Sequence, residues 1–433
     1  MWKRPFILFF SLLLISFLIY WPSQYKYYRK RVDVVPESER EFQGIITLMD
    51  FPHPTAKDPS GFAWIREEIS RFQKKNPGVV IDLVPLNAKD GYARLESAAM
   101  TKAYPDIAPV GGNYWYISKG ILQPLNACID NKETYIPGVL DQVCKDDNIY
   151  GLPWAVTSDV LFANKDLLDG FGLNEEKGLN VADFNNLLAN LEENNKSKKN
   201  DKIYALGGYI DVDDYTLLPL LFKDGGIYNE DGNPDFDRIK EGYLFFSNLG
   251  KRGLLTSNYG TIYRSSAWDK FIKDGKTVFM PGNISDIIKL KDKSDTEFDA
   301  ISYPSDAAAT KRVIAYSVFK QNDPKKMQMI MKFLKQITSE EKQVKLKDFN
   351  LIPVYRSQNG LYSGDKLMEK INGIIDETQY LPRSEHFEML DEIIMTHLRQ
   401  VVLDAEDPDE AAEETKREYN EYISTMSKDK TDK

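Results

Sequence analysis

From Gly44 onward, strand and helix patterns alternate, and this alternation constrains the fold more than any other feature of the sequence. Short apolar or β-branched runs, typical of buried strands, occur at 44–49, 79–84 and 106–110. Apolar residues at helical spacing separate these runs, as in 62–72. The order strand, helix, strand, helix, strand predicts an α/β fold in which helices cover both faces of a parallel sheet.

Two loops of this predicted sheet are the first candidates for a ligand site. In open parallel sheets, ligands bind beyond the carboxyl ends of the strands. The loops that follow the first and third strands are 50–54 and 111–116. We therefore expect these two loops to contribute to ligand binding.

The second half of the body repeats the pattern less regularly. Residues 159–164 have the composition of a strand, and 182–191 that of a helix. Residues 326–338 and 387–402 each place apolar side chains on one helical face. We expect both segments to be amphipathic helices that pack on a core.

The N-terminal segment is distinct from this body. Residues 5–21 carry no charge, which is at the lower limit of the length that a membrane-spanning helix requires. Tyr20 and Trp21 stand where interfacial aromatic residues are expected, and neither a small-residue cleavage site nor a lipobox Cys follows. We expect an uncleaved membrane helix with the body on the extracytoplasmic face; the alternative is a cleaved signal peptide and a secreted body. Basic residues flank the apolar run on both sides, so the charges do not predict its orientation.

The composition excludes several classes of function. A net charge of −10 without a basic stripe argues against a nucleic-acid partner. Two Cys and three His rule out a disulfide scaffold, a Cys-rich zinc module and an iron–sulfur protein. Cys128 and Cys144 leave two alternatives open, a single bridge or two free thiols.

No catalytic motif stands out in the sequence. The phosphate-binding P-loop, the His-Glu-x-x-His zinc motif and the Gly-x-Ser-x-Gly nucleophile motif are absent. His386 and His397 have no second ligand at metal spacing. Asp211 and Asp214 could supply paired carboxylates for glycoside hydrolysis, although acids on one loop are usually just solvated. We therefore expect no catalytic residue, no metal site and no cofactor.

Several segments occur in the order found in one family of binding proteins. Most specific are 149–155 (Ile-Tyr-Gly-Leu-Pro-Trp-Ala) and 161–167 (Leu-Phe-Ala-Asn-Lys-Asp-Leu). Further matching segments are Phe72–Val79, Tyr104–Ile107, Gly120–Leu125, Gly225–Gly226 with Asp231–Gly232, Trp268–Lys276, Met280–Gly282 and Leu351–Pro353. In these segments the chain resembles the extracellular solute-binding proteins of bacterial ABC importers, in the sugar-binding group that includes maltose-binding protein. It departs from that family in lacking a lipobox Cys and in having Val181-Ala-Asp-Phe where Thr-Trp-Asp is common.

The resemblance implies a two-lobe clamp of the periplasmic-binding-protein kind, in which each lobe is a mostly parallel sheet flanked by helices. Mapped onto this sequence, the first lobe comprises 38–153 and 305–345, and the second comprises 154–304 and 346–433. Residues 1–37 form the membrane segment and a basic linker. Closure around a ligand is then a hinge motion at the segments that cross between the lobes. The implied crossings are Pro153–Val156, Ser302–Val313 and Lys345–Ile352.

A sugar presents apolar C–H faces and a rim of hydroxyl groups, so its site needs flat aromatic rings and hydrogen-bonding groups. Trp154 lies at an implied crossing, and Trp268 matches the family segment that carries a cleft aromatic residue. Trp115 belongs to a predicted ligand loop, whereas Trp64 on the first helix is expected to pack. The expected ligand-binding residues are Trp154, Trp268, Trp115, Asp50, Asn113, Asp159 and Tyr303.

The resemblance implies a membrane-anchored extracytoplasmic receptor that binds a mono- or oligosaccharide and delivers it to the permease subunits of an ABC importer. Such a receptor catalyses no reaction and uses no cofactor. Two alternatives stay open. One is a sugar-sensing receptor that signals to a partner protein, and the other is a glycan-cleaving enzyme that uses acids such as Asp211 and Asp214. The sequence predicts neither the sugar nor its chain length.

Overall fold

The computed structural model divides the chain into two compact units, Met1–Gly44 and Ile45–Lys433, each described by itself. The two larger sheets and the candidate site belong to the second unit, called the body below. The residues that the structure describes are 9–22, 41–87, 90–173, 179–198, 201–212, 214–222, 226–291, 297–304 and 309–431.

The first unit contains a helix over 9–22 whose apolar side chains are exposed. Phe9 is 63% exposed and Ile19 is 71% exposed, so no face of the helix is covered. Within the described residues, no helix has both the length and the hydropathy that a membrane crossing requires. The predicted membrane segment starts at residue 5, and its first residues, 5–8, lie outside the described residues, as does the linker 23–37.

The first sheet of the body has the strand order β12-β11-β3-β1-β2, and β6 also pairs with β11. Its strands are β1 (Gly44–Asp50), β2 (Val79–Pro85), β3 (Ile107–Ala108), β6 (Leu152–Thr157), β11 (Ala309–Val318) and β12 (Gln379–Tyr380). Strands β1 and β3 are parallel, and helices α2 (Ala63–Lys75) and α3 (Gly91–Thr101) follow β1 and β2. The predicted alternation of strands and helices over 44–110 is therefore confirmed.

The second sheet has the order β10-β7-β9-β8. Its strands are β7 (Asp159–Asn164), β8 (Tyr204–Leu206), β9 (Thr277–Asn283) and β10 (Phe298–Ile301). Strand β7 is antiparallel to both β9 and β10, whereas β8 and β9 are parallel. In the first sheet, β11 is likewise antiparallel to β3 and β6.

The expectation of mostly parallel sheets is wrong for the second sheet, in which two of the three strand pairs are antiparallel. The first sheet is mixed, since β11 is parallel to β12 but antiparallel to β3 and β6. Ser158 alone separates β6 from β7, so the chain passes from the first sheet into the second without a helical crossover. Strand β11 then pairs with β6 in the opposite direction. Parallel neighbours need a long crossover connection, which these direct passages do not provide.

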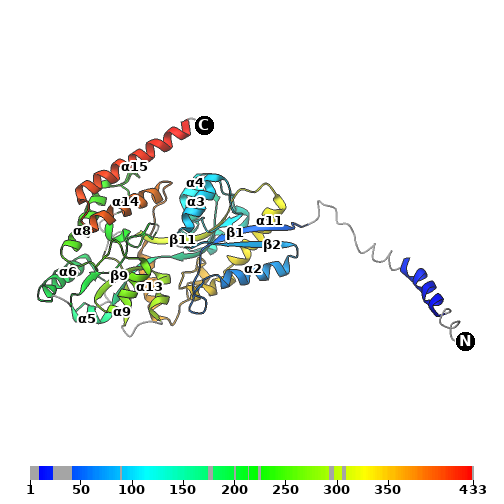
Figure 1. Ribbon diagram of the computed structural model, residues 1–433, viewed down its shortest axis with the longest axis horizontal. Helices are drawn as coiled ribbons and strands as arrows, with labels where there is room; N and C mark the ends of the chain where they lie inside the picture. Colours follow the sequence, from blue (N-terminus) through cyan, green and yellow to red (C-terminus); the bar gives the residue numbers. More distant parts are fainter. Residues whose placement is uncertain are drawn as a thin grey trace. The chain divides into compact units, whose positions relative to one another are not determined.

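Helices cover the sheets and close the hydrophobic cores of the body. In Figure 1, β1, β2, α2, α3 and α11 lie at one end of the body, while β9, α8 and α14 lie at the other. Helix α11 packs on α2, and α8, α14 and α15 pack on one another. The predicted amphipathic helices at 326–338 and 387–402 correspond to α11 and α14 and are confirmed. Of the helices named here, α8 spans Phe236–Lys251, α11 Pro324–Ile337, α14 Phe387–Val402 and α15 Pro408–Thr431. The other helices are α4 (Tyr114–Ser118), α5 (Lys165–Gly170), α6 (Val181–Lys196), α7 (Leu218–Leu221), α9 (Arg264–Asp274), α10 (Ile287–Lys291), α12 (Leu346–Phe349) and α13 (Lys366–Glu377).

Three chain segments lie side by side where the chain passes from the first sheet to the second. Strand β6 pairs with β11 from Thr157 to Leu152. Val156 and Ile352 exchange two backbone hydrogen bonds, with N···O distances of 2.8 and 2.9 Å. These contacts lie at or next to the three implied crossings, although residues 305–308 of the second crossing are outside the described residues. The lobe boundaries themselves stay a prediction.

The two cysteines are both free thiols. Cys128 is buried and Cys144 is half-buried. Of the two alternatives that the sequence left open, the structure shows unbridged cysteines.

Candidate functional site

A cavity of about 340 Å³ opens between the two sheets of the body. We call its two sides the first-sheet wall and the second-sheet wall. The first-sheet wall consists of Phe51, Pro52, His53, Pro54, Tyr92, Pro109, Gly112, Asn113 and Tyr114. The second-sheet wall consists of Asp214, Tyr215, Arg264, Asn283, Ser285, Phe387 and Glu388. The crossing segments and the loop after β12 complete the lining with Thr157, Lys311, Arg312, Val313, Ile314, Phe349, Leu351, Leu381, Pro382, Arg383 and Ser384, and Gln142 also lines the cavity.

The first-sheet wall contains both loops that the sequence identified as ligand loops. Phe51 follows β1 and its ring lies 4.6 Å from that of Tyr92, centroid to centroid. Asn113 caps α4 by accepting a hydrogen bond from the Trp115 backbone N–H at 2.9 Å. This wall is therefore mainly aromatic and uncharged, with a single amide at the start of α4.

Glycines allow the second of these loops to approach β11 closely. A Cβ atom at Gly112 would overlap the carbonyl oxygen of Val313, and one at Gly111 would lie 2.7 Å from the Cα of Gly151. The Gly111 backbone N–H donates to the Ala315 carbonyl at 2.9 Å. Since only glycine lacks the Cβ, the pair Gly111–Gly112 fixes Asn113 against the crossing strands.

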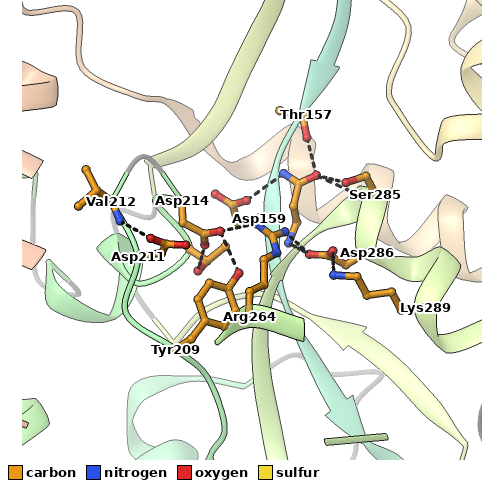
Figure 2. Close-up of polar contacts among 12 residues, drawn as sticks. Thr157, Asp159, Tyr209, Asp211, Val212, Asp214, Arg264, Ser285, Asp286 and Lys289 are labelled. Carbon is orange, nitrogen blue, oxygen red and sulfur yellow. Dashed lines mark hydrogen bonds and ion pairs between the residues drawn. The ribbon is translucent and has the colours of Figure 1, made fainter. Parts of the chain in front are cut away.

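The second-sheet wall is built on buried ion pairs, which Figure 2 shows. Arg264, the first residue of α9, bridges two carboxylates: its Nη1 lies 2.5 Å from Asp214 Oδ2 and its Nη2 lies 2.9 Å from Asp286 Oδ2. Lys289 Nζ lies 2.5 Å from Asp286. Asp214 also accepts hydrogen bonds from the hydroxyls of Tyr209, at 2.8 Å, and Thr216, at 2.5 Å. Both carboxylates of this network are thus held by several donors.

The charges of this network depend on one another. Burial alone would raise the pKa of Asp286, but Arg264 and Lys289 hold it below its ordinary value. Burial opposes the charge of Arg264, yet Asp286 and Asp214 raise the pKa of its guanidinium well above its ordinary value. Buried charges are stable only when they are paired and hydrogen-bonded in this way. The pairing of Arg264 and Lys289 with Asp286 therefore favours the ionised form of that carboxylate.

A second buried pair links the crossing strands to the second sheet. Arg312 of β11 donates two hydrogen bonds to Asp159 of β7, at 2.6 and 2.8 Å. Asn283 donates to Asp159 at 3.0 Å, and its side-chain oxygen accepts from Thr157 at 2.8 Å. Burial opposes the charge of Arg312, but Asp159 raises the pKa of its guanidinium above the ordinary value. The bidentate geometry makes this pair a rigid floor of the cavity.

Two aromatic rings stand above this floor. Tyr215 and Phe387 have ring centroids 5.5 Å apart, and the Arg312 guanidinium lies 5.2 Å from the Tyr215 ring. Tyr215 has a φ of 63°, which non-glycine residues rarely adopt. Such strained positions cluster at ligand sites, where the surrounding contacts hold them in place. The hydrogen bonds of Asp214 and Thr216 on either side provide those contacts.

Of the seven residues expected to bind ligand, the structure places Asn113 alone on the cavity lining. Trp154 and Trp268 were expected on the cleft surface, but each is only 1% exposed. The Trp154 ring stacks on Trp64 at 4.9 Å and lies 4.5 Å from His53, which does line the cavity. Trp268 packs against Phe162, 5.4 Å away, in the core beneath α9. Their surface position is thus corrected, because both indoles fill the space between a strand and a helix or loop.

The other four expected residues lie behind the lining. Asp50 is fully buried and accepts hydrogen bonds from the Tyr316 hydroxyl and the Phe51 backbone N–H. Asp159 holds Arg312, and the buried Tyr303 hydroxyl donates to the Thr216 carbonyl at 2.8 Å. Trp115 is half-buried, with the Lys119 ammonium 5.1 Å from its ring. Asp50, Asp159 and Tyr303 therefore position residues of the wall.

Sequence reasoning missed most of the residues that line the cavity. Lys311 and Arg312 lie within the second implied crossing. Their charged side chains at a crossing could have identified them as candidates for the cavity. Arg264 at a helix start and Tyr215 beside the acids Asp211 and Asp214 gave no signal of their own. Phe387 was assigned to the core as part of an amphipathic helix. These side chains reach the cavity because the fold brings distant segments together.

The described residues give no support for a metal centre. They contain no group of three or more His, Cys, Asp or Glu side chains that could hold a metal ion. Asp214, one of the two acids considered for hydrolysis, is occupied by Arg264, Tyr209 and Thr216. Burial and then the neighbouring Asp214 raise the pKa of Asp211, which does not line the cavity. The contacts of Asp214 are those of a carboxylate that holds the local structure together.

Comparison with known proteins finds a match to one protein family. Residues 68–358 match a family model described as bacterial extracellular solute-binding protein. A Brucella abortus (strain 2308) protein named as a binding protein is 24% identical over 240 residues, which are 52% of this chain and 51% of that protein. The chain thus spans about half the length of the curated relatives that it matches.

Solved structures show the same fold. An ABC substrate-binding protein of Listeria monocytogenes, Lmo0181, in complex with cycloalternan has a TM-score of 0.71 at 16% identity, over 88% of this chain and 100% of that chain. The GacH receptor of Streptomyces glaucescens, solved unliganded and with acarbose, has a TM-score of 0.71 at 19% identity, over 88% and 98%. The expected two-lobe fold is thereby confirmed, with mixed rather than mostly parallel sheets.

Proposed function

Since the chain belongs to the bacterial extracellular solute-binding proteins, we propose that it binds a carbohydrate in the cavity between its two sheets and delivers it to an ABC importer. The family, described as extracellular, supports a location outside the cytoplasm. It is a family of binding proteins, and the residues of the cavity provide groups suited to binding. The permease and its ATP-hydrolysing subunit are separate proteins.

The observation that carries the proposal is the pairing of aromatic rings with polar groups on both walls. Phe51, Tyr92 and Tyr114 supply rings on the first-sheet wall, and Tyr215 and Phe387 supply them on the second. Sugars bind by stacking their C–H faces on such rings and by hydrogen bonding through their hydroxyls. The amides and hydroxyls that can serve the hydroxyls are Asn113, Gln142, Thr157, Asn283, Ser285 and Ser384.

The similar structures support a carbohydrate ligand. The Listeria protein holds cycloalternan and the Streptomyces receptor holds acarbose. The cavity of this chain has a volume within the range that buries a ligand of drug size. Because residues of both walls line the cavity, a ligand bound there can contact both lobes and draw them together.

The crossing segments suit a hinge. Strands β6 and β11 and the residues around Ile352 join the sheets by backbone hydrogen bonds, while the walls are carried on loops and helix starts. A ligand that contacts both walls favours the closed form by its differential affinity. Binding should therefore reduce the radius of gyration of the body.

A thermal-shift screen of the full-length protein against mono- and oligosaccharides tests the proposal. A ligand present at about 100 times its Kd adds about 2.7 kcal/mol to the free energy of unfolding, which raises Tm measurably. Calorimetry then gives Kd for each sugar that raises Tm. A panel in which no carbohydrate raises Tm, while amino acids, peptides or polyamines do, would contradict the proposed ligand.

We further propose that the N-terminal segment anchors the protein to the membrane. The support is the helix over 9–22, whose apolar side chains are exposed. Mass spectrometry of the membrane fraction should recover peptides that contain Tyr20 to Asp33. A mature protein that begins near Gln24 and is found in the medium would replace this proposal with secretion.

A further inference from the structure

Two cations on the cavity lining differ from the others in their surroundings. Arg264 and Arg312 are each held by carboxylates, at 2.5 to 2.9 Å, in the networks described above. Lys311 and Arg383 also line the cavity, but neither forms an ion pair within the described part of the chain. The lining therefore contains two cations that no carboxylate of the described residues pairs with.

Lys311 lies at the start of β11, in a partly buried position. Its Nζ lies 5.2 Å from the centroid of the Tyr380 ring, on the neighbouring strand β12. Burial lowers the pKa of Lys311, and the one carboxylate that opposes this, Asp376, acts only through space. Charged side chains in such positions are normally paired, since desolvation of an unpaired charge costs free energy.

Arg383 lies two residues beyond Leu381, whose backbone N–H donates to the Lys311 carbonyl at 3.0 Å. Its guanidinium is 4.7 Å from the centroid of the Tyr114 ring and donates to the Cys144 carbonyl. Burial lowers the pKa of Arg383 as well, against weaker opposing effects of Tyr114, Cys144 and Asp141. The side chain is exposed, and the Tyr114 ring and the Cys144 carbonyl orient its guanidinium, which forms no ion pair with a described residue.

The balance of charge on the lining supports the same conclusion. Of the four cations on the lining, Arg264 is paired with Asp214 and Asp286, and Arg312 is paired with Asp159. Lys311 and Arg383 are the two lining cations for which the described residues provide no carboxylate in an ion pair. A positive charge of this kind on a cavity wall attracts an anion.

From these contacts we infer that the carbohydrate bound in the cavity carries an anionic group, which Lys311 and Arg383 bind together. The inference rests on the proposed function and specifies its ligand class. Arg383 offers a planar fork of donors that suits a carboxylate, sulfate or phosphate, and Lys311 adds a compact charge. The rings and amides of the two walls then bind the neutral part of the sugar.

Calorimetry with the full-length protein tests this inference. The probes are trigalacturonic acid and the neutral galactotriose, with galactose 6-phosphate and galactose 6-sulfate to distinguish the type of anion. We expect at least one anionic probe to bind about tenfold or more tightly than its neutral counterpart, with an affinity that falls as salt is raised. Preference for the uronate, the phosphate or the sulfate identifies which group the two cations hold.

Variants identify the residues responsible. Arg383→Gln and Lys311→Gln should each weaken binding of the anionic probe by about tenfold or more and leave neutral sugars nearly unaffected, because each removes one charge-assisted contact. Lys320→Gln, an exposed position just beyond β11 and outside the lining, is the matched control. Tm without ligand shows that each variant folds, and Arg383→Lys should restore part of the affinity.

The outcomes separate the two levels of the proposal. Tight binding of neutral sugars that neither substitution alters overturns the anionic inference and keeps the proposed function. Binding of amino acids or peptides with no response to any sugar overturns both. Equal loss of neutral and anionic binding in Arg383→Gln shows a general structural role and also overturns the inference.

Discussion

The two walls of the cavity are built by different physical means. The first-sheet wall consists of rings, prolines and glycines on loops, supported from behind by a stack of buried aromatic side chains that includes Trp154 and Trp64. The second-sheet wall depends on carboxylates and guanidinium groups that neutralise one another. The first wall is therefore held by packing, and the second by charge pairing, in which loss of one partner leaves the other charge unpaired.

The largest effect should come from breaking a buried charge pair. Asp159→Ala removes the carboxylate behind the lining and leaves Arg312, on the lining, unpaired. Removal of one partner of such a pair costs about 3–5 kcal/mol of stability. Urea unfolding monitored by tryptophan fluorescence measures this loss. The double variant Asp159→Leu with Arg312→Leu should recover a large part of the stability, since neither charge remains. A loss below about 1 kcal/mol in the single variant would show that the pair is hydrated and not structural.

A substitution in the packing behind the first-sheet wall should destabilise the protein but leave the ligand affinity of the folded molecules unchanged. Trp154→Ala removes a ring that is 1% exposed and should lower the free energy of unfolding by about 3–5 kcal/mol through the cavity it leaves. Calorimetry on the folded fraction should then give a Kd close to that of the unchanged protein. The contrary result, weak binding with intact apo stability, would return Trp154 to the ligand-contact role first expected from the sequence.

A ring on the lining should behave in the opposite way. Tyr215→Ala removes a side chain that stands over Arg312 on the cavity surface, and truncation of such an anchor costs about 2 kcal/mol of binding, roughly 30-fold in affinity. Apo stability should change less than in Trp154→Ala, because the Tyr215 side chain is only half-buried and Ala keeps the same positive φ. Leu244→Ala, which alters an exposed apolar residue of α8 outside the lining, serves as the control for a general loss of hydrophobic surface.

The smallest expected effect is a change in how stability depends on pH, and it arises from Asp286 in the ion-pair network of the second-sheet wall. Arg264 and Lys289 lower the pKa of Asp286 in the folded state, so its ionised form stabilises the fold above the ordinary carboxyl pKa. That contribution is lost as the pH falls through the lower folded value. Urea midpoints measured from pH 5 down to about pH 2.5 should therefore fall less steeply in Asp286→Asn than in the unchanged protein. Parallel pH profiles would show that other carboxylates dominate acid unfolding.

Sequence patterns predicted the scaffold and its two ligand loops more successfully than the ligand residues. The apolar periods over 44–110 locate strands and helices because burial of one face leaves a local trace in the sequence. The loops 50–54 and 111–116 follow from that topology, and both contribute to the lining. Tryptophan, in contrast, is a poor marker of a ligand surface, since the same large ring fills core space equally well.

What the sequence alone determined is the alternation of elements, the absence of common catalytic motifs and, through the order of short segments, the family. What only the tertiary structure decided is which side chains meet at the cavity. Tyr215, Arg264, Arg312 and Phe387 are far apart in the chain, yet all of them line one cavity. Local periodicity records whether a residue faces a core, but a binding surface depends on long-range strand pairing. Here that pairing is between β6, β11 and the residues around Ile352, and no local pattern encodes it.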